Sequence, residues 1–254
     1  MKWKRIWSVT EITLLQLIRR RITLVLLLVI PSLFFWVVDF TTSKRITPFK
    51  LATVSEETYL KVPARDESLV FIGVAAVGFL ASFLGLNLVQ KNVGVHRRMV
   101  LAGYRSWEIF IALFAVLFFT VGLLSLYVGL ALHLFFTPQN LTGTLLGVFS
   151  AGVVYGSYGI LSGVLIRGEL EGMLLIVLLA NIDAGWLQNP LFYDGAQHQE
   201  LIRYLPAWFP SQATLTAAFT SHSFNESLGF STLYGLGLLL LGLLLYIYKM
   251  RIFK

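Results

Sequence analysis

The sequence predicts an all-α integral membrane protein with six transmembrane helices, an N-terminal interfacial amphipathic helix and a re-entrant outer helical hairpin before the last span. Of the 254 residues, 57% are hydrophobic and 13% are charged, which is about half the charged share of a soluble domain. The apolar residues form long runs, and about 20 such residues cross a bilayer as a helix. Lys and Arg gather in the segments between alternate runs, which favours one membrane orientation.

Residues 1–254 are expected to form a single transmembrane domain, and residues 1–21 precede its first span. Five residues recur there at spacings of four and three, so they share one face of a helix: Trp3, Trp7, Thr10, Leu14 and Leu17. Lys2, Lys4 and Arg5 stand near its start. Interfacial Trp and basic side chains favour a helix lying among lipid headgroups. The alternative is a frayed basic tail.

The candidate spans carry few charges and follow one another at 22–38, 69–89, 109–136, 141–166, 172–187 and 230–248. Four of them are long enough to cross about 30 Å of hydrocarbon, whereas the first and the fifth are short. In the fourth span, small residues recur every four positions, from Gly143 through Gly147 to Ala151. Such spacing predicts close helix packing in lipid.

The distribution of basic residues predicts the orientation. With both termini in the cytoplasm, the cytoplasmic segments 1–21, 90–108, 167–171 and 249–254 hold 14 of the 20 Lys and Arg residues. The positive-inside rule selects this topology. We expect a multi-pass protein of the plasma membrane of a bacterial cell. The sequence pI of 9.7 then reflects topology, and no basic surface with interleaved aromatic residues indicates nucleic-acid binding.

The segment 188–229 is too apolar for a solvated loop and is interrupted by Pro206 and Pro210. Its stretch LPAWFPSQ, which contains Trp208, predicts short helices that dip back into the outer leaflet and cover the space between the spans. The other outer segment, 40–68, is polar and too short for a domain with its own core.

The sequence contains no HExxH, GxSxG or GxxxxGK[ST] motif and no cysteine, so the chain is not expected to be an enzyme or to bind a cofactor. One acid attracts attention, because Asp183 falls in the fifth span beside Asn181 and a charge at membrane depth is costly. It either contacts polar substrate or water from within the span, or marks the end of a short span near the outer interface.

The segment 92–106, after the second span, combines basic and apolar residues. Gly94 and Gly103 flank its central part, which contains His96, Arg97 and Arg98, and Arg105 follows Gly103. An ordinary positive-inside loop would explain the charge but not the embedded apolar residues. We therefore predict a short transverse helix that docks on a partner protein and transmits a push to the two spans it joins.

These features together resemble the membrane subunit of type-2 ATP-binding-cassette exporters. The likeness rests on the amphipathic N-terminal helix, six spans, the pattern G-x-x-R-R-x-x-x-x-G at residues 94–103, and the Pro-broken hairpin before the last span. Many members carry an acid close to the first glycine, and residues 90–94 contain none. The resemblance implies that residues 92–106 form the coupling helix, which seats in a groove of the ATPase subunit.

The expected function is that of an exporter permease subunit. It would pair with a second permease subunit and with two cytoplasmic ATPase subunits, which would bind ATP and Mg²⁺, and would move an amphipathic or hydrophobic substrate. The residues expected to line the pathway are Asn181, Asp183, Pro206, Trp208 and Pro210. The alternatives are an ATP-independent channel or secondary carrier, and a non-transporting membrane scaffold or sensor subunit.

Overall fold

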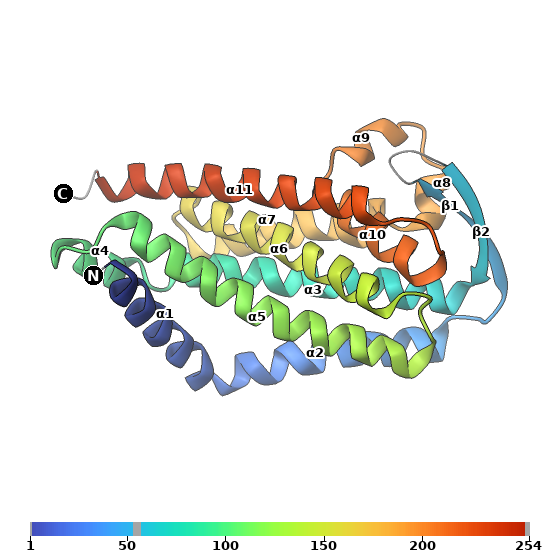
Figure 1. Ribbon diagram of the computed structural model, residues 1–254, viewed down its shortest axis with the longest axis horizontal. Helices are drawn as coiled ribbons and strands as arrows, with labels where there is room; N and C mark the ends of the chain where they lie inside the picture. Colours follow the sequence, from blue (N-terminus) through green and yellow to red (C-terminus); the bar gives the residue numbers. More distant parts are fainter. Residues whose placement is uncertain (1, 53–56, 252–254) are drawn as a thin grey trace.

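The computed structural model, which describes residues 2–52 and 57–251, is a bundle of long helices with a small β-hairpin at one end (Figure 1). The helices in chain order are α1 Lys2–Arg19, α2 Arg21–Thr41, α3 Ala64–Gln90, α4 Val93–Leu101, α5 Ser106–Phe135, α6 Leu141–Leu165, α7 Glu169–Ile182, the π-helical turn η1 Asp183–Leu187, α8 Pro190–Asp194, α9 Gln199–Arg203, α10 Trp208–Phe219 and α11 Asn225–Arg251. The strands are β1 Ile46–Ala52 and β2 Glu57–Pro63. We call the end with α4 the basic end and the end with the strands the hairpin end.

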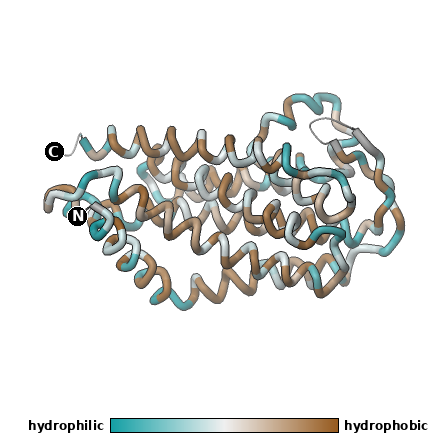
Figure 2. The backbone as a smooth tube through the Cα atoms, in the orientation of Figure 1, coloured by the Kyte–Doolittle hydropathy of each residue, from teal (hydrophilic) through white to brown (hydrophobic). Residues whose placement is uncertain are grey.

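Within the described residues, six helices are long and apolar enough to cross a membrane: α2, α3, α5, α6, α7 with η1, and α11. Each predicted span falls on one of them. The fifth, predicted at 172–187, begins three residues earlier at Glu169, and its last part is the π-helical turn η1, which ends at Leu187 as predicted. Apolar residues fill the middle of the bundle and polar residues gather toward its two ends (Figure 2). The protein is a multi-pass helical membrane protein.

The α1 helix confirms the predicted N-terminal helix, but its predicted apolar face is divided, with Leu17 packed inward and the two tryptophans exposed. Its packed residues are Ile6, Val9 and Leu17, whereas Trp3 is 82% exposed and Trp7 is 71% exposed. The helix is interrupted at Arg20 before α2 begins, and α1 lies at an angle to α2 (Figure 1). The tryptophans are thus free to meet the headgroup layer, where their amphipathic rings are favoured.

The centre of the bundle is the contact between α3 and α6, the most buried spans in the described part of the chain. Small residues let their backbones meet: a Cβ added at Gly159 would stand 2.0 Å from the Ser82 carbonyl oxygen, and one at Gly85 would stand 2.3 Å from the Gly156 oxygen. The predicted packing role of the small residues in this span is confirmed. The remaining face of α6 packs against α5, α10 and α11.

The hairpin end contains a structure that the sequence analysis missed. Strands β1 and β2 pair antiparallel, with Ile46 opposite Pro63. Phe49 and Leu51 point inward and pack with Val70 of α3 and Leu215 of α10. The outer segment 40–68 is therefore a lid on the bundle and not a plain polar loop.

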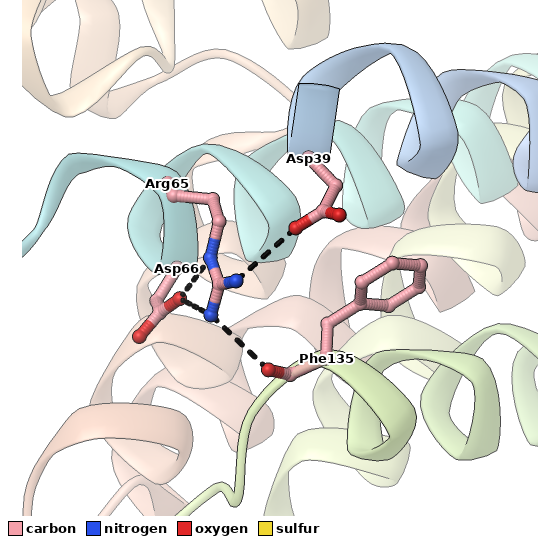
Figure 3. A network of polar contacts seen from close by, with 4 residues as sticks. All are labelled: Asp39, Arg65, Asp66 and Phe135. Atoms are coloured by element: carbon pink, nitrogen blue, oxygen red, sulfur yellow. Dashed lines mark hydrogen bonds and ion pairs between the residues drawn. The ribbon is translucent and has the colours of Figure 1, made fainter. Parts of the chain in front are cut away.

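A partly buried arginine joins three spans at the hairpin end (Figure 3). The Arg65 guanidinium lies 3.1 Å from an Asp39 oxygen of α2 and 2.8 Å from an Asp66 oxygen of α3. It also donates to the Phe135 carbonyl oxygen at the end of α5, at 3.2 Å. That carbonyl belongs to the last turn of α5, where no intrahelical donor is available.

The α10 helix forms the returning leg of the re-entrant segment. Its residues from Ser211 to Ala218 are all buried, and the backbone N–H groups of Gln139 and Asn140 donate to the Ala218 and Ala217 oxygens, each at 3.0 Å. The entering leg, residues 204–207, is not helical. The predicted hairpin of two helices is thus one helix joined to an irregular leg, because Pro206 has no N–H and restricts Leu205.

The α3–α6 contact leads to a first prediction. We expect Gly159→Ala to lower the free energy of unfolding by about 3 kcal/mol, because a backbone oxygen cannot move aside as a flexible side chain can. Gly237→Ala is the matched control, since no atom lies within 4 Å of its added Cβ. Reversible unfolding in detergent micelles measures both variants. Equal stability of the two would contradict this account of the contact.

Candidate functional site

The α4 helix presents a mixed basic and apolar surface at the basic end. Gly94, Arg97 and Arg98 are exposed there, together with Val95 at 39% and Leu101 at 75% exposure. We call these five residues the α4 surface. Exposed apolar side chains beside two guanidinium groups, outside the spans, form an amphipathic surface that suits contact with either a protein or the membrane surface.

Gly103 ends α4 in the left-handed region, with a φ of 90°. The Tyr104 N–H donates to the Met99 oxygen at 3.0 Å and the Gly103 N–H to the Val100 oxygen at 3.1 Å, which is a Schellman ending. Arg105 then precedes α5 with an exposed side chain, and its backbone N–H donates to the buried Glu108 carboxylate at 2.9 Å. The turn between α4 and α5 is therefore fixed.

His96 belongs to the opposite face of α4. It is 2% exposed, and its ring meets that of Tyr246 on α11 edge to face at 6.2 Å. Its Nδ1 atom is buried without a hydrogen-bond partner in the described chain, and burial lowers the pKa of His96 from 6.5 to about 4. His96 was predicted to contact the partner because it is a neighbour of Arg97 and Arg98 in the sequence. In the structure its ring is buried between α4 and α11.

The α1 helix also holds α4 in place. The Arg5 Nη1 atom donates to the Gly103 carbonyl oxygen at 3.0 Å, and the Arg5 guanidinium lies 5.5 Å from the centre of the Tyr104 ring. A cation over a tyrosine face is attracted by the ring quadrupole. Arg5, near the start of α1, therefore stabilises the turn that follows α4.

A second polar site lies inside the bundle around Asp183, which is 5% exposed. Its carboxylate accepts a hydrogen bond from the Tyr155 hydroxyl of α6, one from the Gln188 amide at 2.9 Å, and one from the Ala207 N–H at 3.0 Å. We call this arrangement the Asp183 network. It joins α6, η1 and the entering leg of the re-entrant segment.

The Asp183 network lies near half the depth of the bundle. Tyr155 falls in the middle of α6, and its ring packs against Gly78 in the middle of α3. The α10 helix that returns from this level to the hairpin end has 12 residues, or about 18 Å of rise. Asp183 is therefore a buried group inside the bundle, which favours its interpretation as a polar group within the span over its interpretation as the end of a short span.

Three of the remaining predicted pathway residues lie close to the network along the chain. Pro206 directly precedes Ala207, and Trp208 is buried against Tyr193, with ring centres 4.6 Å apart. Pro210 is buried in the first turn of α10, where a missing N–H costs nothing.

Asn181 lies elsewhere. It is exposed on the outside of α7, and its amide donates to the Val177 oxygen of its own helix at 2.7 Å.

Two members of the Asp183 network were not identified from the sequence. Tyr155 falls in a span that was interpreted only as a packing surface, and Gln188 was placed at the start of the outer segment. A phenol in the middle of a small-residue span was the available signal, because a buried tyrosine hydroxyl needs a partner. Finding its partner required the fold.

Within residues 2–52 and 57–251, no three His, Asp or Glu side chains gather closely enough to hold a metal ion. A scan against protein-family models finds no match for the chain, and a search of curated proteins finds none either.

The burial of His96 predicts a loss of stability in mild acid. The pKa in the folded protein, about 4, lies below the unfolded value of 6.5, so between these values the unfolded chain binds the proton more readily. We expect acidification from about pH 7 to about pH 5 to remove about 2 kcal/mol of stability through this group. Unfolding of wild type, His96→Phe and His133→Phe across that range measures it.

His133→Phe replaces a histidine that is exposed on α5 and is the matched control, and His96→Phe is expected to reduce the slope. Identical slopes for wild type and His96→Phe would show that His96 is not buried as a neutral ring.

The Asp183 network predicts a large difference between two nearby substitutions. Asp183→Ala leaves the Tyr155 hydroxyl and the Ala207 N–H without their acceptor, so we expect a loss of about 3 kcal/mol or more. Asn181→Ala, two residues away and exposed, is expected to cost less than about 1 kcal/mol. Unfolding in micelles compares them, and equal losses would show that the network does not stabilise the re-entrant segment.

Proposed function

We propose that the chain is the membrane subunit of an ATP-driven exporter of the ATP-binding-cassette class, worked by separate ATPase subunits. The observation that carries the proposal is the α4 surface. It is an exposed, basic and partly apolar helix face at one end of six spans, and α4 joins two of those spans, α3 and α5. ATP and Mg²⁺ would bind to the partner ATPase subunits, and the conformational change of those subunits would be transmitted to this chain through α4.

The proposed movement follows contacts on the inward face of α4. A push on Arg97 and Arg98 would reach α3 and α5 through the chain, α11 through His96 and Tyr246, and α1 through the bond from Arg5 to Gly103. Packed helices respond to such a push by shifting between discrete arrangements. ATP binding and hydrolysis in the partner would select between these arrangements.

The pathway in this proposal opens toward the re-entrant segment. Asp183 holds the entering leg at Ala207, so release of that bond would free the segment at mid-depth, with Pro206, Trp208 and Pro210 at the moving junction. The described spans offer few fixed charges, which favours an amphipathic or hydrophobic substrate. The exposed apolar faces of α2, α7 and α11 leave room for a second permease subunit and for lipid.

The orientation in this proposal has the basic end in the cytoplasm, with both termini on that side of a bacterial plasma membrane. Support comes from the residues gathered at that end: Lys4, Arg5 and Arg19 of α1, Lys91, and Arg97, Arg98 and Arg105 around α4. Excess Lys and Arg in short loops favours the cytoplasmic side.

A charge-reversal pair tests the proposal. We expect Arg97→Glu with Arg98→Glu to abolish co-purification with a soluble protein that carries a phosphate-binding loop, and to abolish substrate-stimulated ATP hydrolysis in reconstituted lipid. Lys4→Glu with Arg19→Glu makes the same change in charge on exposed residues of α1 at the same end and is expected to retain both.

Two outcomes would favour the other classes of protein. Transport by the purified chain in nucleotide-free vesicles would indicate a channel or secondary carrier. Stable binding of the ATPase without any substrate-stimulated hydrolysis or transport would indicate a scaffold or sensor subunit.

A further inference from the structure

Two cavities adjoin where α1 and α2 meet α3, and both are lined by Thr23, Leu84 and Asn87. The smaller one, of about 60 Å³, lies at the basic end and is also lined by Arg20 and Lys91. The larger one, of about 300 Å³, is also lined by apolar side chains, among them Leu26, Ile30, Phe79 and Phe83. We call the two together the α2–α3 groove.

The groove runs from the membrane surface into the hydrocarbon. Along α2, Arg20 precedes Ile30 by ten residues, or about 15 Å of helix. Along α3, Lys91 follows Phe79 by twelve residues, or about 18 Å. Because Arg20 marks the break between the angled α1 and the span α2, the polar end of the groove is level with the lipid headgroups.

The polar end carries groups that suit a phosphate ester. The Arg20 guanidinium has no ion-pair partner among the described residues, and Lys91 lies opposite, 3.4 Å from an exposed Glu169 oxygen. Guanidinium groups bind phosphate oxygens in paired, charge-assisted hydrogen bonds. The Asn87 Oδ1 atom is buried at the junction of the two cavities without a partner in the part of the chain that the structure describes, so it is available to accept from a hydroxyl.

The apolar end suits a hydrocarbon chain and nothing charged. Leu26, Leu27, Ile30, Leu80 and Phe83 line it, and a volume of about 300 Å³ holds part of an acyl chain while the rest lies in the bilayer. A free phosphate ion would use only the polar end. A ligand with a phosphate at one end and a hydrocarbon chain at the other uses both.

We propose that the α2–α3 groove binds an anionic phospholipid of the surrounding leaflet as a resident ligand. Its phosphate lies between Arg20 and Lys91, its glycerol level meets Asn87, and one acyl chain lies along Leu26 and Phe83. An uncharged or anionic headgroup substituent is accepted, whereas a choline ammonium group would face two cations. The bound lipid holds the break between α1 and α2 against α3, and this role does not depend on the proposed exporter function.

Native mass spectrometry of the full chain in detergent, titrated with phosphatidylglycerol or phosphatidylcholine, tests the proposal. We expect one phosphatidylglycerol to be retained in preference to phosphatidylcholine, and Arg20→Gln to weaken its binding about tenfold through loss of a charge-assisted hydrogen bond. Arg21→Gln, an exposed neighbour that does not line the groove, is expected to change binding less than about twofold.

A second pair of variants tests the apolar end independently. Leu26→Trp fills the groove and is expected to weaken binding of both lipids, whereas Leu28→Trp, on the exposed side of the same helix, leaves binding unchanged. Both positions are exposed, so neither variant is expected to unfold the bundle.

Four results would overturn the proposal. Equal losses in Arg20→Gln and Arg21→Gln would indicate diffuse attraction of lipid to a basic surface. Displacement of the lipid by millimolar inorganic phosphate would indicate an anion site only. Equal effects of Leu26→Trp and Leu28→Trp, or equal retention of the two lipids by wild type, would indicate lipid held in the detergent belt.

Discussion

The structure depends on the direct backbone contact between α3 and α6. In hydrocarbon, apolar side chains gain nothing by leaving lipid for one another, so helices associate through close packing and polar bonds. Gly159 against Ser82 and Gly85 against Gly156 bring these two helices close together, and the spans α2, α5, α7 and α11 pack on the pair. The Tyr155 ring lies on Gly78 beside this contact, which fixes the phenol that reaches Asp183.

The two candidate regions are connected by α11. At the basic end its Tyr246 ring meets His96 of α4. Twelve residues earlier, or about 18 Å along the helix, the Tyr234 hydroxyl donates to the Tyr204 carbonyl oxygen of the re-entrant segment at 3.2 Å. A shift of α11 under a load on α4 would therefore act directly on the leg that Asp183 holds. In the proposed function, this connection is the physical route by which the partner would release the re-entrant segment at mid-depth of the bundle.

Much of the fold could be predicted from the sequence because the bilayer penalises charge and unpaired backbone so strongly. The six spans follow from that penalty, whereas the N-terminal helix was predicted from the spacing of its residues and the close packing of the fourth span from the spacing of its small residues. The β-hairpin was missed because its inward residues, Phe49 and Leu51, alternate over only a few positions in a segment with many charges. Its apolar partners, Val70 and Leu215, come from distant parts of the chain.

The candidate sites were harder to predict because their geometry depends on contacts between distant residues. The sequence indicated that 92–106 forms a helix, but not that His96 faces Tyr246, 150 residues later. It marked Asp183 as unusual, but the depth of that carboxylate depends on Tyr155 and Ala207. Asn181, two positions earlier in α7, faces outward. Which side of a helix a residue faces depends on its angle around the helix axis. That angle could not be predicted here because a π-helical turn begins at Asp183.

In the proposed function, the α4 surface contacts a nucleotide-binding partner. Because the sequence contains no cysteine, a single Leu101→Cys substitution offers one site for cross-linking in native membranes, with the buried Val100→Cys as its control. The account predicts one cross-linked product at position 101, containing a soluble protein with a phosphate-binding loop, and none at position 100. Cross-linking at position 101 only to lipid or to a second copy of this chain would contradict it.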